Sequence, residues 1–192
     1  MEIKDKDILY MRGSSNRLHR LVTAALFAAL CCVATMIHIP SATNGSYNLG
    51  DTVVLLSAWL LGSAYGTAAA GIGSALADLF SGYVYYVPGT LIIKSVMAFT
   101  GACIASCGNK KGRGAFILRI VSAVTAECIM VAGYFVYAAY ILGYGTAAAF
   151  LSLPGNCFQG IFGMVISLLL YSVLNRSRIA EPLINKIERR SF

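Results

Sequence analysis

Long runs of apolar residues, separated by short polar segments, dominate the chain. Five such stretches cover residues 21–39, 52–80, 87–107, 115–143 and 149–174. Each reaches or approaches the roughly 20 residues that a helix needs to cross the hydrocarbon core of a bilayer. Because lipid cannot satisfy open backbone N–H and C=O groups, we expect every stretch to be helical. The pattern predicts an all-α integral membrane protein.

The second stretch, 52–80, fits either one long helix or two short helices bent at Gly62-Ser-Ala-Tyr-Gly66. The basic residues favour two crossings, because the N-terminus, the loop at 110–113 and the C-terminal tail then share the cytoplasmic side. Of the fifteen Lys and Arg residues, only Lys94 lies away from that side. Neither Lys nor Arg occurs in the three outer connections, near residues 40–50, 81–90 and 144–153. We therefore predict six transmembrane helices in one bundle, with both termini cytoplasmic.

This topology divides the chain into three parts. They are a cytoplasmic basic N-terminal segment at 1–20, a six-helix membrane domain at 21–174 and a cytoplasmic basic tail at 175–192. The first apolar run is longer than the apolar region of a cleaved signal peptide, so we expect it to remain as the first span. The two helices from 52–80 have about 13 to 17 residues each, so they must thin the bilayer or be shielded by neighbours.

Composition narrows the possible functions. The chain is 58% hydrophobic and 12% charged, whereas soluble domains have about 25% charged residues. Its net charge of +7 suits membrane topology and anionic headgroups better than nucleic acid, because the basic residues flank apolar runs. His19 and His38, the two histidines, fall on opposite sides of the membrane, and the segment 108–114 lacks the order of a phosphate-binding loop. We expect no enzyme, no metal site and no cofactor.

Four ionisable residues interrupt the apolar stretches: Asp51, Asp78, Lys94 and Glu127. Such groups are costly in a bilayer and face protein or a water-filled cavity. In the six-helix topology the first three reach one level near the outer face. Glu127 lies near the middle of its helix, where it either reaches the bottom of a pocket or hydrogen-bonds within the bundle in protonated form.

Polar and aromatic residues share that outer level, which is typical of a pocket for a small polar molecule containing a ring. The predicted substrate-binding residues are Asn48, Asp51, Asp78, Tyr85, Lys94, Glu127, Asn156 and Gln159. Structural alternatives remain open. Asp51 could cap its helix, Asp78 and Lys94 could form a buried ion pair, and Tyr85 could belong to an interfacial aromatic belt.

The first span carries a strip of small side chains. Ala24 and Ala28 are four residues apart, as are Ala25 and Ala29, so each pair lies on one helix face. A flat alanine strip lets another helix pack closely and slide or detach. The strip is either a docking surface for a partner or part of the protein's own packing.

Three further segments carry a resemblance to a known family. They are Tyr47-Asn-Leu-Gly-Asp51, Gly71-Ile-Gly-Ser-Ala-Leu-Ala-Asp78-Leu-Phe-Ser-Gly82 and Pro88-Gly-Thr-Leu-Ile-Ile-Lys94. With the alanine strip, six predicted helices and the chain length, they resemble the S components of energy-coupling factor (ECF) transporters, in the riboflavin-type or vitamin B6-type branch. The similarity covers nearly the whole chain.

The resemblance implies a subunit of the bacterial cell membrane that captures a small water-soluble vitamin or precursor from outside. Pyridoxine, a pyrimidine or pyrazine-like precursor, and riboflavin are the candidates. The resemblance further implies docking through Ala24, Ala25, Ala28 and Ala29 on an ECF membrane coupling subunit, which works with two cytoplasmic ATPases.

Two other classes of membrane protein compete with this one. A self-sufficient, ion-coupled secondary transporter of a small polar metabolite is the alternative, because Asp78 and Glu127 leave ion coupling open. Such a transporter usually shows two related halves, and the chain has no clear internal repeat. A purely structural scaffold does not explain the polar residues gathered at the outer face.

Overall fold

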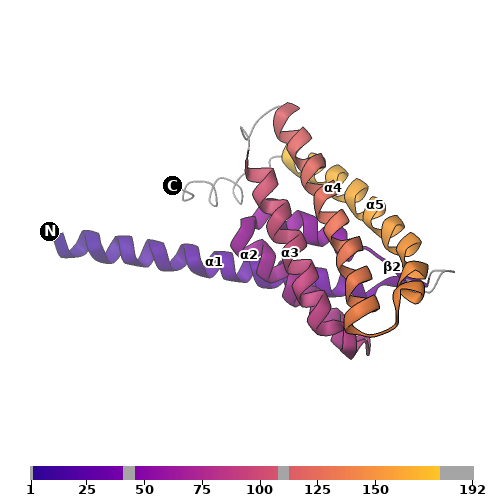
Figure 1. Ribbon diagram of the computed structural model, residues 1–192. Helices are drawn as coiled ribbons and strands as arrows, with labels where there is room; N and C mark the ends of the chain where they lie inside the picture. Colours follow the sequence, from indigo (N-terminus) through magenta and orange to yellow (C-terminus); the bar gives the residue numbers. More distant parts are fainter. Residues whose placement is uncertain (1, 41–45, 108–112, 178–192) are drawn as a thin grey trace.

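The computed structural model describes residues 2–40, 46–107 and 113–177. Helices dominate, with one small pair of antiparallel strands, β1 and β2, between the first two helices (Figure 1). The elements in order are α1 (Glu2–Met36), β1 (His38–Pro40), β2 (Ser46–Asn48), α2 (Gly50–Phe80), η1 (Val84–Tyr86), α3 (Val87–Ser106), α4 (Arg113–Val136), η2 (Tyr137–Ile141) and α5 (Thr146–Arg176).

Five helices in the described part of the chain are long and apolar enough to cross a membrane. The candidate spans are Arg17–Met36, Gly50–Phe80, Val84–Ser106, Arg113–Ile141 and Thr146–Arg176. Large apolar side chains face outward along these helices, as Phe158 (64% exposed) and Leu169 (62%) do on α5. The predicted helical membrane architecture is therefore confirmed, whereas the predicted count of six spans is not.

Helix α2 bends sharply at Gly62, inside the segment where the sequence pattern was ambiguous. Gly62 has φ 78° and ψ −175°, a backbone conformation that side chains with a Cβ rarely adopt. The Ser57 hydroxyl lies 3.2 Å from the carbonyl oxygen of Gly66, whereas nine residues of straight helix would separate them by about 13 Å. The chain therefore folds back, and the segments before and after Gly62 pack against each other.

Helix α1 begins before the apolar run that predicted it. It starts at Glu2, passes through the basic N-terminal segment without a break and projects beyond the rest of the bundle (Figure 1). The segment holds five Lys and Arg residues, which have a high helix propensity although they are not apolar. The predicted boundary at residue 20 thus marks a change in polarity inside one helix.

Small residues hold the first three helices together. A Cβ on Gly73 of α2 would overlap the carbonyl oxygen of Ala28 in α1, and a Cβ on Gly71 would overlap the Ser95 hydroxyl in α3. These glycines let the backbones approach closely. The core beside them contains the fully buried Leu55, Met97 and other side chains of α2, α3 and α4.

Candidate functional site

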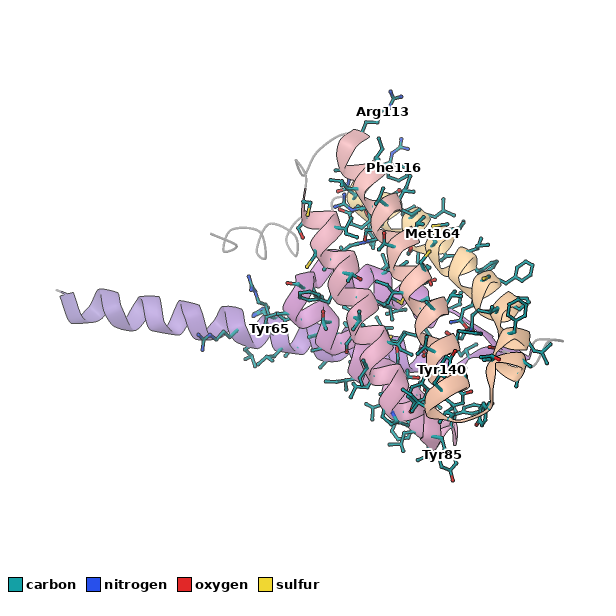
Figure 2. All side chains as sticks on the ribbon, viewed as in Figure 1. Tyr65, Tyr85, Arg113, Phe116, Tyr140 and Met164 are labelled. Carbon is teal, nitrogen blue, oxygen red and sulfur yellow. The ribbon has the colours of Figure 1, made fainter. Side chains whose placement is uncertain are left out.

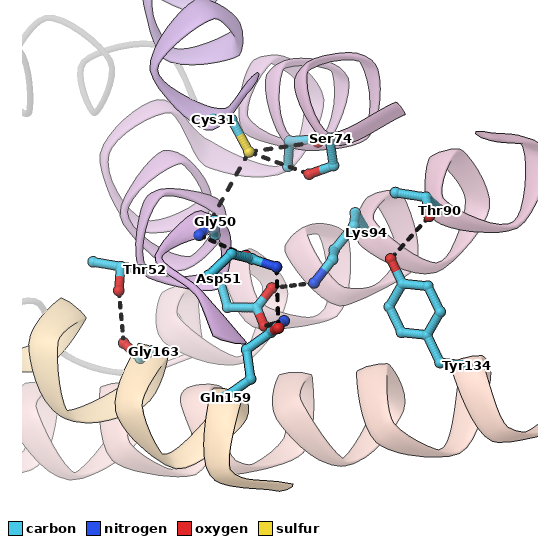
Figure 3. Close-up of polar contacts among 12 residues, drawn as sticks. Cys31, Gly50, Asp51, Thr52, Ser74, Thr90, Lys94, Tyr134, Gln159 and Gly163 are labelled. Carbon is cyan, nitrogen blue, oxygen red and sulfur yellow. Dashed lines mark hydrogen bonds and ion pairs between the residues drawn. The ribbon is translucent and has the colours of Figure 1, made fainter. Parts of the chain in front are cut away.

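A buried ion pair lies at the centre of the predicted outer cluster. Asp51, in the first turn of α2, is 0% exposed, and Lys94 of α3 is 3% exposed. The Lys94 ammonium donates to Oδ1 of Asp51 (Figure 3). Two structural alternatives from the sequence are wrong. Lys94 pairs with Asp51 rather than Asp78, and the N-cap position of α2 is Leu49, so Asp51 is not the cap.

Helix α5 and strand β2 extend this pair into a chain of hydrogen bonds. Gln159 donates from Nε2 to Oδ2 of Asp51 over 2.6 Å, and Asn48 donates from Nδ2 to Oε1 of Gln159 over 3.0 Å. Asn48 also accepts a bond from the backbone N–H of Gly50 (2.9 Å). We call Asn48, Asp51, Lys94 and Gln159 the polar cluster. Four elements therefore supply it, and both Asp51 carboxylate oxygens accept a bond.

Glu127 of α4 lies beside the polar cluster without joining it. Its side chain packs on two glycines of α5: a Cβ on Gly160 would lie 3.0 Å from Oε2, and one on Gly163 would lie 3.2 Å from Oε1. The same Gly163 Cβ would lie 2.8 Å from Cβ of Asp51, so Gly163 separates the two acids. Glu127 is 7% exposed, and neither carboxyl oxygen has a hydrogen-bond partner in the part of the chain that the structure describes.

The remaining predicted site residues lie at different depths. Asp78 is half-buried near the end of α2, and its Oδ2 is buried without a partner among the residues described. Asn156 is half-buried one turn before Gln159 on α5. Tyr85 is 79% exposed, and Figure 2 shows it at the extreme end of the bundle. The Tyr85 backbone contacts η2, since the Tyr137 hydroxyl donates to the Tyr85 carbonyl oxygen (2.8 Å).

Two residues near Lys94 were missed in the sequence analysis. The ring centroid of Tyr134 lies 5.4 Å from the Lys94 ammonium, close enough for a cation–π contact. The Tyr134 hydroxyl is 2.9 Å from the Thr90 hydroxyl, which places both side chains on the same side of α3 as Lys94. The sequence does indicate Tyr134, because it follows Glu127 by about two helical turns and lies on the same helix face.

The alanine strip borders an apolar groove between α1 and the second segment of α2. The groove has a volume of about 740 Å³. All four predicted docking residues line it: Ala24, Ala25, Ala28 and Ala29. Ala25 and Ala29 are exposed, whereas Ala24 and Ala28 are half-buried. One edge of the strip therefore packs on α2, and the other edge is uncovered. We call this feature the alanine groove.

Comparison with known proteins identifies the family. The profile of the "ECF-type riboflavin transporter, S component" family matches residues 15–176, which include every element from the end of the basic segment to the end of α5. The chain belongs to this family. As an S component, it is a multi-pass membrane protein of vitamin uptake, and its family is a class of transporter subunits rather than of enzymes.

A relative of this S component occurs in Pyrococcus woesei. That protein is described as an uncharacterized protein in the gap 3′ region, and it is 32% identical over 139 residues, covering 72% of this chain and 88% of its own length. The similarity spans most of both chains. Its description says nothing of a ligand, and the family match leaves the vitamin open.

A second polar group of the S component lies away from the polar cluster, around the first half of α4. Trp59 of α2 donates its indole N–H to Ser122 of α4 (3.0 Å), and Ser122 donates to the carbonyl of Gly101 in α3 (2.7 Å). The ring of Tyr171 in α5 meets Trp59 edge-on, with centroids 5.7 Å apart, and stacks 4.0 Å from the Arg119 guanidinium. This inner aromatic cluster ties α2, α3, α4 and α5 together.

Proposed function

We propose that this S component captures a small water-soluble vitamin or vitamin precursor on the outer side of the bacterial cell membrane. The observation that carries the proposal is the polar cluster itself. Ionisable groups buried between membrane helices are expensive, and they commonly mark substrate pathways. Asp51 and Lys94 lie inside a bundle whose outward-facing side chains are largely apolar. Pyridoxine, a pyrimidine or pyrazine-like precursor, and riboflavin are the candidate substrates.

We further propose that the chain crosses the membrane six times, with both termini cytoplasmic. The reversal of α2 at Gly62 supports this topology, because it turns one long apolar stretch into two short antiparallel segments. The first segment, 50–61, has a length of only about 18 Å. It has neighbours on several sides and is mostly buried, which is how a short membrane helix avoids thinning the bilayer.

The proposed partners are an ECF membrane coupling subunit and two cytoplasmic ATPases. The alanine groove supports this assignment, since it is apolar, lies on the outside of the bundle and exposes Ala25 and Ala29. Small side chains at a helix surface allow a second helix to approach closely inside a membrane. In this proposal the S component binds the vitamin, and the partner module supplies the energy of ATP hydrolysis.

The test of capture begins with the full chain purified in mild detergent. The protein is denatured, and any released small molecule is identified by mass spectrometry. We expect a stoichiometric B6 vitamer, flavin or related heterocycle. An empty preparation that also binds no member of a vitamin panel at nanomolar concentrations would contradict the proposal.

A further inference from the structure

Three arginines gather where α4 begins and α5 ends. Arg113 is the first residue of α4, Arg176 lies in the last turn of α5, and both are exposed. Arg119 is half-buried six residues further along α4, and its guanidinium stacks on the ring of Tyr171 in α5. Neither 113–126 nor 160–177 contains an Asp or Glu residue. This end of the two helices therefore carries a positive charge that no nearby acid on either helix balances.

The Arg119 side chain extends toward the start of α4. Its Nη1 donates to the carbonyl oxygen of Ala115, one turn earlier (3.1 Å), and its Nη2 donates to the Tyr171 hydroxyl. These bonds and the stacking fix the orientation of the guanidinium between α4 and α5. Arg119 forms no ion pair in the part of the chain that the structure describes. A guanidinium has five N–H donors and is always charged, so Arg119 keeps both donors and a charge for a further partner.

The guanidinium lies at the level of the lipid headgroups. The span Arg113–Ile141 has 29 residues and is therefore about 43 Å long, whereas the hydrocarbon core of a bilayer is about 30 Å thick. A centred span extends about 6 Å beyond the hydrocarbon at each end. Ala115, which Arg119 contacts, lies only about 3 Å along the helix from Arg113. Arg119 thus places its charge in the interface, as arginines near the ends of membrane helices commonly do.

We propose that this end of α4 and α5 binds the phosphate of an anionic phospholipid. Arg119 is the principal contact, and Arg113 and Arg176 add flanking charge. The planar fork of an arginine matches two phosphate oxygens, and basic sites between membrane helices on the cytoplasmic side bind anionic headgroups. In the proposed topology this end is cytoplasmic, so the inner leaflet supplies the lipid. The site lies outside the polar cluster and does not involve the vitamin.

Apolar side chains beside the arginines favour a lipid over free phosphate. Phe116 (44% exposed) and Ile117 (53%) follow Arg113 on α4, and Val173 (64%) precedes Arg176 on α5. A free phosphate would use the arginine charges alone. A phospholipid also covers these apolar side chains with its acyl chains, which adds to the binding.

The first experiment counts the lipids that the full chain retains in mild detergent, by native mass spectrometry. Three probes share dioleoyl chains: phosphatidylglycerol is anionic, phosphatidylcholine has a phosphate neutralised by choline, and diacylglycerol has no phosphate. Phosphatidylglycerol should be retained at least about fivefold more strongly than phosphatidylcholine, and diacylglycerol least. Equal retention of the two phospholipids would overturn the proposal. Displacement of phosphatidylglycerol by inorganic phosphate at equal concentration would also overturn it, because the site would then bind free phosphate.

The second experiment uses Arg119→Gln, which removes the charge and the stacked fork. The preference for phosphatidylglycerol over phosphatidylcholine should fall at least about threefold. Arg20→Gln is the matched control, since Arg20 of α1 also stacks on a tyrosine, 5.9 Å from the ring centroid of Tyr65. It removes the same charge and should leave the preference unchanged. An equal fall in both variants would show that net charge alone attracts the lipid, and the proposed site would be wrong.

A third measurement locates the lipid on the wild-type chain. Phosphatidylglycerol with a photoreactive headgroup is crosslinked to the protein, and the adducts are mapped by peptide mass spectrometry. Adducts should concentrate in 113–119 and 171–177, whereas an even spread over the ends of all helices would contradict the proposal. This measurement needs no variant, so poor folding of Arg119→Gln does not shield the proposal. None of these outcomes bears on vitamin capture, which has its own test.

Discussion

The polar cluster and the alanine groove differ in chemistry and in position: one is a set of hydrogen-bonded polar side chains inside the bundle, and the other is an apolar surface on its outside. The polar cluster is buried apart from the half-buried Asn48, and it joins residues as far apart as Asn48 and Gln159, 111 positions along the chain. The alanine groove lies on the outside and is built from α1 and the second segment of α2. The reversal at Gly62 separates the two regions, because Asp51 lies on the segment of α2 before Gly62 and the wall of the groove lies on the segment after it.

The two regions nevertheless share a boundary at Cys31. This thiol lies 3.2 Å from the Ser74 hydroxyl on the second segment of α2 and 4.0 Å from the carbonyl oxygen of Gly50 at the start of the first (Figure 3). Helix α1 therefore touches the backbone beside Asp51 while its alanines face the groove. The proposed binding and docking regions therefore differ in chemistry but lie next to each other in the fold.

The largest effect is expected in the polar cluster. Lys94→Met removes the cation that neutralises Asp51 and leaves a fully buried acid without its charge partner. Breaking a buried pair in this way typically costs about 3–5 kcal/mol. Thermal unfolding in detergent should show this loss, and vitamin binding should disappear with it. The double variant Asp51→Asn/Lys94→Met serves as the control and should recover part of the stability; no recovery would argue that Lys94 acts independently of Asp51.

The alanine groove should respond in the opposite way. Ala25→Trp adds a bulky ring at an exposed position, so stability and vitamin binding should stay unchanged while uptake falls at least about tenfold, because close helix packing is blocked. Uptake is measured in cells that express the complete transporter. Leu26→Trp is the matched control, since Leu26 is 57% exposed on α1 and lies outside the groove lining. Uptake that survives Ala25→Trp would contradict docking at this surface.

A smaller effect is expected at the inner aromatic cluster, which serves neither region directly. Ser122→Ala removes the acceptor of the Trp59 indole N–H and should lower the free energy of unfolding by about 1–2 kcal/mol. Trp59 is the one tryptophan of the chain, so its fluorescence reports the change without interference. A shifted emission with unchanged vitamin affinity is the expected result. A large loss of affinity would instead connect this cluster to the binding site.

The smallest effect on stability is expected at Tyr85. Tyr85→Ala should change the free energy of unfolding by no more than about 0.5 kcal/mol, because the side chain is 79% exposed. Its role in binding is therefore easy to isolate. A loss of vitamin affinity at unchanged melting temperature would place the ring against the substrate, and unchanged affinity would remove Tyr85 from the predicted binding residues.

The sequence by itself determined the features that depend on local periodicity. Long apolar stretches required helices, the spacing of Ala25 and Ala29 placed them on one face, and the glycines around residue 62 marked where α2 reverses. These follow from the geometry of a single helix and from the solvent around it. They do not depend on which helices are neighbours, because any arrangement of the bundle surrounds each helix with apolar groups.

Only the tertiary structure decided which polar groups meet. Lys94 pairs with Asp51, whereas the ion pair considered from the sequence joined Lys94 to Asp78. Glu127 lies against Gly160 and Gly163 with no partner among the described residues. Partner choice depends on the relative depth and rotation of separate helices. Side-chain packing along whole helix interfaces sets this depth and rotation. The residue pattern within one helix therefore does not predict them.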